Sequence, residues 1–473
     1  MGPRSVVTAA GSIAIALAAA AQQPPAAATA AGYRDAAARL IEAAKGSGKG
    51  YEVLQHLTDR IGPRLSGSEQ AAEAVRWTAE HLRRQGLAVS LDPFPAPRWV
   101  RGVETGEILA PARQKLALTA LGESPPTPEH GVSAEVVEVA SLEALDALGE
   151  ARVRGKIVLF NRVMKPGWDG PETYGAVGAL RGRGPAQAAR LGAVAALVRS
   201  LGTLSARLPH TGGTDFPKDG PEIPAAAVAA EDAELIHRLL ASGEPVKVQL
   251  VLGCRRLPDV ESANVVADLR GRERPDEIVV IGAHLDSWDL GTGAVDDGAG
   301  VAMVIESLRL MKSLGLAPRR TVRGILYMSE EIRATGGRAH AESHRAELGR
   351  YVAAIEADAG GAPPVGFTAG VGPGGLELLA GIAGLLKGLG ADPVQAGYSG
   401  ADIEPLRALG QVPVLGLRLD GTHYFDWHHT PGDTLDKVDP AELAQGAAAM
   451  AVMAYVLADM PGTLARPPAE AAH

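Results

Sequence analysis

The stretch EIVVIGAHLDSWDLGTGAVDDGAG, residues 277–300, carries the clearest fold signal in the chain. Its apolar run, residues 278–281, predicts a strand buried on both faces, because apolar side chains occupy every position rather than every second one. From Gly298 onward the apolar residues repeat at helical spacing. His284 and Asp296 therefore fall between the carboxyl end of a strand and the start of a helix, which is where ligands bind in open α/β sheets.

The alternation of strand and helix continues beyond this stretch. Strands are predicted at residues 264–269, 321–328, 351–355 and 413–419, and helices at residues 34–44, 51–57, 69–85, 374–389 and 441–460. This order predicts an α/β fold in which a mostly parallel mixed sheet has helices on both faces. A further strand at residues 88–94 is expected to end at the proline-rich segment PFPAPRW.

A chain of 473 residues is too long for one ordinary core, and a second, smaller α/β unit is predicted at residues 121–257. Its strands are expected at residues 135–139, 156–160, 193–198, 224–228 and 246–252. The sequence of this unit has no cluster of residues at metal-ligand spacing, and its His210 is expected at the surface. We therefore interpret it as an accessory insert in a catalytic domain made of residues 51–120 and 258–464.

The two ends of the chain carry separate signals. Arg4 precedes an uncharged, mostly apolar run that ends at Ala21, and this pattern predicts a secretory signal peptide over residues 1–21. The run is alanine-rich and shorter than the ~20 strongly apolar residues of a membrane span, so no stable membrane insertion is expected after its removal. Export to the periplasm or the medium follows from this reading. Residues 22–50 are expected to form a loose leader with a first helix, and residues 465–473 a disordered tail.

Composition narrows the function classes. Hydrophobic residues make up 46% of the chain and charged residues 21%, which is typical of a globular protein. The net charge of -9 and the aromatic content of 4% argue against a nucleic-acid partner, which requires a basic face. Cys254 is the sole cysteine, so an intramolecular disulfide is excluded and a buried apolar role is expected for it.

Possible metal ligands follow four of the predicted strands. They are His284 and Asp296 after the first, Glu330 and Glu331 after the second, Asp358 after the third and His429 after the fourth. Parallel strands bring such loops together at one edge of the sheet. Nitrogen and oxygen donors without a thiolate suit zinc or a similar cation. Two histidines and three carboxylates are too many ligands for one catalytic zinc, and they fit two ions that share one carboxylate and a water.

The spacing of these residues suggests roles for some of them. Asp296 lies in a tight turn, where it can bridge two ions, and Asp286 can accept the second ring N–H of His284. Glu330 and Glu331 are adjacent in extended backbone, so their side chains point in opposite directions. One of them is expected to bind metal and the other to act as a general base.

Several motifs identify a resemblance to a known family. HLDSWDLGTGAVDDG, SEEI, IEADAG and HHTPGDT, with LTDRIGPRLSGS near the start, resemble the secreted zinc exopeptidases of the carboxypeptidase Q (plasma glutamate carboxypeptidase) type. These belong with the co-catalytic zinc aminopeptidases. The resemblance covers residues 51–460, and it implies that the insert is a protease-associated domain.

The resemblance also implies a role for each site residue. Asp296 bridges two zinc ions, His284 and Asp358 hold one of them, Glu331 and His429 hold the other, and Glu330 is the base. The peptide bond between Asp296 and Asp297 is expected to be cis. His428 is expected to lie behind the metal or in the substrate pocket. Tyr398 and Asp402, in the motif YSGADI, are expected near the substrate, with Asp402 contacting a free amino group.

The expected reaction is hydrolysis of a dipeptide or short peptide with a free terminus, in which a hydroxide bridging the zinc ions attacks the carbonyl and Glu330 carries the proton. The residues leave open whether the enzyme is a carboxypeptidase, an aminopeptidase or a strict dipeptidase. One alternative is a glutaminyl cyclase-like aminoacyl transferase, which keeps a single zinc. Another is a catalytically silent binding protein on the same fold. The resemblance further suggests a homodimer.

Overall fold

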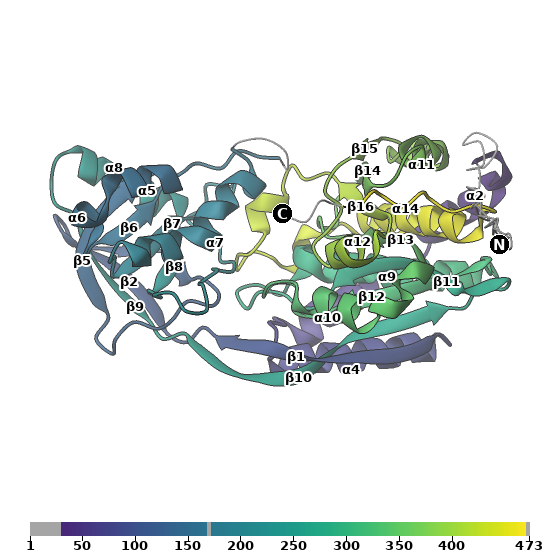
Figure 1. Cartoon of the computed structure of the whole chain (residues 1–473), viewed down its shortest axis with the longest axis horizontal. Helices are drawn as coiled ribbons and strands as arrows, with labels where there is room; N and C mark the ends of the chain where they lie inside the picture. Colours follow the sequence, from purple (N-terminus) through teal and green to yellow (C-terminus); the bar gives the residue numbers. More distant parts are fainter. Residues whose placement is uncertain (1–29, 168–171, 470–473) are drawn as a thin grey trace, which may run out of the picture.

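The computed structural model describes residues 30–167 and 172–469. The predicted signal peptide, residues 1–21, lies outside the described residues, as do residues 22–29 of the predicted leader and residues 470–473 of the predicted tail. Two sheets form two units side by side (Figure 1), and the smaller unit is inserted into the larger one.

The larger unit is built on an eight-stranded sheet in the order β1-β10-β12-β11-β13-β16-β14-β15. Its strands are β1 (Ala88–Val100), β10 (Arg255–Leu269), β11 (Arg274–His284), β12 (Arg320–Tyr327), β13 (Tyr351–Glu356), β14 (Pro364–Gly370), β15 (Val394–Ala396) and β16 (Val414–Leu419). Three central pairings are parallel: β12·β11, β11·β13 and β13·β16. The pairings β1·β10, β10·β12 and β14·β16 are antiparallel. The sheet is therefore mixed with a parallel centre, and β11 occupies the middle position that its continuous apolar run predicted.

Strand β1 continues through the proline-rich segment that was expected to end it, and that prediction is wrong. Pro93, Pro95 and Pro97 all lie within β1, which pairs with β10 along its length apart from a register shift between Ala96 and Arg98. An edge strand tolerates proline, and prolines spaced two apart can all direct their missing N–H away from the neighbouring strand. The resulting β1·β10 ribbon runs from the larger unit toward the smaller one (Figure 1).

Helices cover the larger sheet. They are α2 (Arg34–Lys45), α3 (Lys49–His56), α4 (Glu69–Arg84), α9 (Ala299–Ser313), α10 (Thr335–Ser343), α11 (Gly375–Ala383), α12 (Glu404–Gly410), α13 (Tyr424–Trp427) and α14 (Pro440–Asp459). Short helical turns are η1 (Leu57–Ile61), η2 (Ala294–Gly298), η3 (Arg345–Arg350), η4 (Gly384–Leu389) and η5 (Leu435–Lys437).

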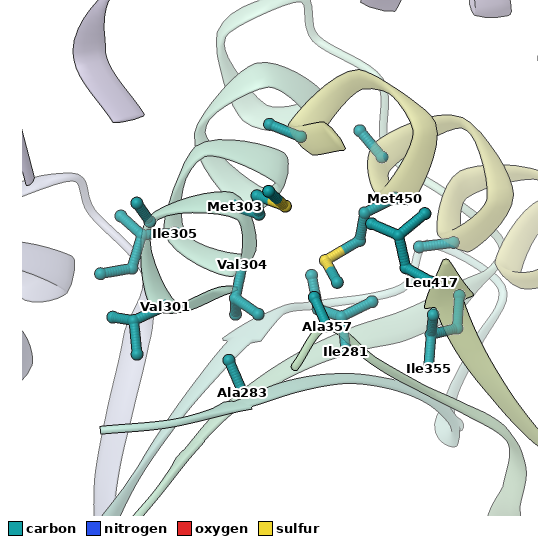
Figure 2. Close-up of a cluster of buried hydrophobic side chains, with 14 of the residues drawn as sticks. Ile281, Ala283, Val301, Met303, Val304, Ile305, Ile355, Ala357, Leu417 and Met450 are labelled. Atoms are coloured by element: carbon teal, nitrogen blue, oxygen red, sulfur yellow. The ribbon is translucent and has the colours of Figure 1, made fainter. Parts of the chain in front are cut away.

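The main core lies between the sheet and helices α9 and α14. Figure 2 shows Met303 of α9 and Met450 of α14 above Ile281 and Ile355 of the sheet, and all four side chains are buried. Burying a side chain of this size stabilises the fold by about 1.5–3 kcal/mol. Helix α14 is long and apolar enough to cross a membrane, but most of its residues are buried inside the protein, so it serves here as a core helix.

The smaller unit contains a second eight-stranded sheet, in the order β3-β2-β9-β5-β6-β7-β8-β4. Its strands are β2 (Glu104–Ala110), β3 (Gln114–Leu116), β4 (Leu118–Ala120), β5 (Val132–Val139), β6 (Ile157–Phe160), β7 (Ala195–Arg199), β8 (Ala225–Val228) and β9 (Lys247–Leu252). Its helices are α5 (Leu142–Leu148), α6 (Glu150–Val153), α7 (Tyr174–Arg190) and α8 (Ala230–Ala241). Strands β2, β3 and β4 lie before the predicted boundary at residue 121. They belong to the smaller unit, because β2 pairs with β9 and β4 pairs with β8. The second sheet therefore begins earlier than the sequence pattern indicated.

The C-terminal segment is ordered for longer than expected. Arg466 lies in the predicted disordered tail, yet its guanidinium donates to the backbone carbonyls of Gly410, Leu348, Gly349 and Tyr351. These bonds attach residue 466 to the sheet and to α12, which corrects the prediction at that position.

Candidate metal centre

The predicted metal ligands converge at the carboxyl ends of the parallel strands. β11 ends at His284, Glu330 and Glu331 follow β12, Asp358 follows β13, and His429 lies in the loop after β16. Because β12, β11, β13 and β16 are consecutive in the sheet, their loops meet above one edge.

Asp296 joins two groups of side chains. Its Oδ1 atom is 3.0 Å from Nε2 of His284, and the same nitrogen is 3.8 Å from Oδ1 of Asp358. Its Oδ2 atom is 3.0 Å from Nε2 of His429, which is in turn 3.1 Å from Oε2 of Glu331. Each oxygen of one carboxylate thus faces a separate imidazole with a further carboxylate beside it.

These residues fit a pair of cations that share Asp296. Neighbouring candidate ligand atoms lie 3.0 to 3.8 Å from one another. This matches the distance between neighbouring ligand atoms around a cation whose metal–ligand bonds are about 2.0–2.2 Å. Oδ2 of Asp296 is buried and has no hydrogen-bond partner among the described residues, although Nε2 of His429 is close. Burial by itself lowers the pKa of His284, but Asp296 and Asp358 raise it well above its ordinary value, so the surroundings favour positive charge. The nitrogen and oxygen donors suit zinc.

Backbone carbonyls orient both imidazoles. Nδ1 of His284 lies 3.1 Å from the backbone oxygen of Asp286, and Nδ1 of His429 lies 3.2 Å from the backbone oxygen of Thr211. Donation from Nδ1–H to a carbonyl leaves Nε2 free to bind metal. Thr211 belongs to the smaller unit, so that unit helps to orient one of the candidate ligands.

The Asp286 carboxylate does not orient His284 as expected. Its Oδ1 atom is 3.8 Å from Nδ1 of His284, which is too long for a hydrogen bond, and it accepts instead from the backbone N–H of Glu330 at 3.0 Å. Because Asp286 is only two residues from His284, its backbone carbonyl and not its side chain contacts the His284 ring. Asp286 therefore supports the backbone of the glutamate pair.

The two glutamates face different partners. Oε2 of Glu331 is close to Nε2 of His429, and its Oε1 accepts from the backbone N–H of Trp288 at 3.2 Å. Glu330 lines the adjoining cavity. Burial raises the pKa of Glu330 well above its ordinary value, opposed by His284 and supported by Asp358. Both glutamates line the cavity, and only Glu331 lies within 4.0 Å of a candidate metal-binding imidazole among the described residues.

Side chains from distant parts of the chain fix the turn that carries Asp296. Asp433 accepts from the backbone N–H groups of Ala294, Val295 and Asp296 at 2.8, 2.6 and 3.1 Å. The peptide bond between Asp296 and Asp297 is cis, as the resemblance implied. The Asp297 carboxylate accepts from the backbone N–H of His284 at 3.1 Å. This network holds Asp296 and the His284 imidazole in a fixed relation.

Arg64 supports the same loop from behind. Its guanidinium is fully buried and donates to the carbonyls of Leu285, Gly62, Thr292 and Gly293 at 2.7 to 3.1 Å. Arg64 lies in the motif GPRLSGS, which contributed to the family resemblance without any role being assigned to it.

His428 lies beside the centre and makes fewer contacts with it than His429. Its Nε2 atom is 3.5 Å from Oδ2 of Asp296, and its ring stacks on His429 with the centroids 3.5 Å apart. Burial and the neighbouring His429 lower the pKa of His428 well below its ordinary value. His428, His429 and Asp296 place ligand atoms within 4.8 Å of one another, and the supporting or substrate-side role of His428 stays a prediction.

A cavity of about 980 Å³ opens next to the centre and is lined by both units. Tyr398 lies on its wall with 69% of its surface exposed, and its contact with substrate stays a prediction. Asp402 does not line this cavity. Its side chain is fully buried beneath the wall, next to Gly337, and neither carboxylate oxygen has a hydrogen-bond partner among the described residues. The structure therefore gives Asp402 no direct access to a substrate amino group.

Sequence patterns alone assigned no role to several residues at the site. Asp433 lies in the motif HHTPGDT, but the sequence did not indicate which groups it hydrogen-bonds. Tyr424, Tyr174 and Arg181 also line the cavity, and the latter two come from α7 of the smaller unit. His210 was expected at the surface but is buried, and burial lowers its pKa to about 3. It lies beside Thr211, in the loop that contacts His429.

Comparison with known sequences identifies relatives over most of the chain. Residues 264–454 match the model of peptidase family M28. The chain is 37% identical over 440 residues to carboxypeptidase Q of Mus musculus, covering 92% of this chain and 92% of that protein. It is 36% identical over 423 residues to carboxypeptidase Q of Homo sapiens, covering 89% and 88% of the two chains.

Solved structures give the same result. A peptidase M28 precursor from Shewanella amazonensis superposes with a TM-score of 0.89 at 39% identity, covering 92% of this chain and 99% of that one. A zinc aminopeptidase from Bacillus subtilis superposes with a TM-score of 0.63 at 21% identity, covering 87% and 95% of the two chains, and this likeness concerns the fold alone.

Proposed function

The chain belongs to peptidase family M28, in the group of the carboxypeptidase Q proteins, and from this premise we propose that it is a zinc-dependent exopeptidase that cleaves dipeptides or short peptides with a free terminus. The observation that carries the proposal is the geometry of Asp296, whose two carboxylate oxygens each face one imidazole at 3.0 Å. A single zinc site, as in a glutaminyl cyclase-like enzyme, would not require the second group.

Two zinc ions are proposed, with Asp296 as the shared ligand. His284 and Asp358 would complete one site, and Glu331 and His429 the other. When bound, the ions would act as Lewis acids toward the peptide carbonyl and would make a water more acidic.

Glu330 is proposed as the general base. It lines the cavity beside the metal ligands, and the backbone N–H of Glu330 is fixed by the Asp286 carboxylate. Its carboxylate would take a proton from the water that adds to the peptide carbon and pass that proton to the amine nitrogen as the C–N bond breaks.

The smaller unit is proposed to be a protease-associated domain, as the resemblance implied. Its support for His429 through the Thr211 carbonyl fits a unit that completes the active site. Export through the segment at residues 1–21 and assembly as a homodimer stay predictions.

The proposal is tested with a panel of free and N-blocked dipeptides and the Glu330→Gln variant. We expect the zinc-loaded protein to cleave the unblocked peptides, and the variant to lose about 10²–10⁴-fold in kcat. Elemental analysis should find two zinc ions per chain in both proteins, because glutamine at position 330 leaves the proposed ligands intact.

Glu347→Gln serves as the control, since Glu347 is exposed and lies in η3. It should retain the wild-type rate. A zinc-loaded wild-type protein that cleaves none of the peptides would refute the peptidase proposal and favour a binding role. Full activity of Glu330→Gln would refute only the assignment of the base.

A further inference from the structure

Arg181 of α7 brings a cation from the smaller unit to the cavity. It lines the same space as Asp296 and Glu330. Its Nη1 donates to the carbonyl of Thr211 at 3.2 Å, and its Nη2 donates to the hydroxyl of Tyr174 at 2.7 Å. The Thr211 carbonyl also accepts from Nδ1 of His429, so Arg181 and the proposed metal ligand His429 donate to the same carbonyl.

The guanidinium is held in one place. Its Cζ lies 5.2 Å from the centre of the Tyr174 ring, which is a cation–π distance. On another side the backbone of Gly212 approaches so closely that a Cβ there would lie 2.3 Å from Cζ of Arg181. Any side chain at Gly212, where φ is +138°, would displace the guanidinium. A cation fixed in this way loses little freedom when it binds a ligand.

No acidic side chain in residues 30–167 and 172–469 lies within 4.0 Å of the Arg181 guanidinium. Its Nε is buried and has no hydrogen-bond partner in that part of the chain. Arg101, another arginine of low exposure, instead pairs with Asp289 at 2.5 Å. A guanidinium that lines a cavity and has only neutral acceptors is suited to an anionic oxygen of a ligand.

The identity of the anion follows from the reaction, and this step rests on the proposed function. Consider a peptide whose scissile carbonyl lies at the metal centre and whose leaving group is the C-terminal residue. Its terminal carboxylate then lies about one residue beyond the cleaved bond. We propose that Arg181 binds this free C-terminal carboxylate, so that the enzyme selects peptides that end one residue after the cleaved bond. The smaller unit thereby supplies substrate selection as well as support for His429.

The test compares three substrates of matched sequence: a dipeptide with a free carboxylate, the same dipeptide as its C-terminal amide, and an amide whose second residue is glutamate. We expect wild-type kcat/KM to be roughly 10–100-fold higher for the free acid than for the plain amide, as the loss of a charge-assisted hydrogen bond implies. Arg181→Met should remove this preference, mainly through KM, and leave the rate on the plain amide within about threefold. Arg181→Lys should restore part of it, because lysine keeps the charge but not the forked donor geometry.

Arg183→Met is the matched control. Arg183 is exposed, lines the same cavity from the same helix and forms no ion pair with any residue of 30–167 or 172–469. It should keep the wild-type preference. Zinc content is measured in every variant, because Arg181 shares the Thr211 carbonyl with His429.

The outcomes separate this inference from the proposed function. Equal cleavage of free acid and amide by the wild type, or an equal loss on both in Arg181→Met, would overturn the role of Arg181 while the peptidase activity stands. A loss confined to the glutamate amide would assign Arg181 to a substrate side chain and overturn the C-terminal assignment. Failure of the wild type on all three substrates would count against the proposed function itself.

Discussion

At the residue scale, the candidate metal centre depends as much on residues that hold the backbone as on the ligands. Asp433 binds three consecutive backbone N–H groups that end at Asp296, and it is buried. Without it, those donors would be buried and unpaired, and the turn could move. Such supporting groups commonly change metal affinity by 10–100-fold.

Replacing this carboxylate should therefore weaken metal binding without removing a ligand. Asp433→Asn is expected to lower zinc affinity by about 10–100-fold, because one acceptor oxygen becomes a donor that faces N–H groups. Titration against a chromophoric chelator measures the change. Asp436→Asn, in the same loop but with an exposed side chain, should bind zinc like the wild type. An unchanged affinity in Asp433→Asn would show that the turn holds its shape without these bonds.

At the element scale, helix α10 is attached to strand β1 by a buried histidine. Nδ1 of His340 lies 2.6 Å from Oδ2 of Asp92, and its Nε2 lies 3.1 Å from the hydroxyl of Tyr351. Burial lowers the pKa of His340 below 6.5, against the opposite effect of Asp92, while His344 and Arg323 lower it further. The folded protein therefore holds His340 neutral more strongly than the unfolded chain does.

This shift predicts how stability changes with pH. A histidine whose pKa is lowered on folding contributes stability above pH 6.5, and that contribution is lost as the pH falls below 6.5 toward the folded-state value. His340→Gln should cost about 1–3 kcal/mol at pH 7 through the lost buried hydrogen bond. The difference between wild type and variant should shrink at pH 5, as measured by urea unfolding at both pH values.

His237 provides a control of opposite sign. A hydrogen bond to Glu138 raises the pKa of His237, so its contribution is present at low pH and is lost as the pH rises through its folded-state value. His237→Gln should produce a small difference that grows toward pH 5. A His340→Gln difference that also grows toward pH 5 would contradict the assignment of a neutral His340.

At the scale of the whole molecule, the cavity belongs to both units. Thr203 of the smaller unit donates from its backbone N–H to Phe425 and from its hydroxyl to Asp426, at 3.2 and 2.6 Å. The backbone N–H of Thr211 donates to the carbonyl of His429 at 3.0 Å. Thr203 and Thr211 thus attach the smaller unit to residues 425–429, and the β1·β10 ribbon joins the units on another side.

Metal removal should destabilise the protein as a whole. Asp296, Glu331 and Asp358 converge on the imidazoles of His284 and His429, and chelation would remove the cations proposed to join these side chains. A ligand present at 1,000 times its dissociation constant stabilises the folded state by about 4 kcal/mol, so the melting temperature should fall after chelation and recover with zinc. Differential scanning calorimetry measures both steps. Asp296→Asn should respond much less to chelator, and an identical wild-type Tm with and without metal would contradict the prediction.

Much of the fold followed from the sequence, because burial within one element leaves a periodic pattern. The continuous apolar run of β11 predicted a central parallel strand, and the polar residues after β11, β12, β13 and β16 predicted where the site would form. The edge strand β1 and the short strands β2 to β4 were missed or cut short. Prolines obscure a strand at an edge, and strands β3 and β4, of three residues each, leave no clear period.

The sequence by itself determined which side chains are available at the candidate centre: His284, Asp296, Glu330, Glu331, Asp358 and His429. Tertiary structure alone decided how they are oriented and what else faces them. The Thr211 carbonyl contacts His429 across 218 positions of sequence, and Arg181 donates to the same carbonyl from helix α7. Asp402 lies within the motif YSGADI, but its side chain is buried and does not line the cavity. Local patterns record whether a residue is buried in its own element, whereas contacts between distant segments depend on how whole elements pack.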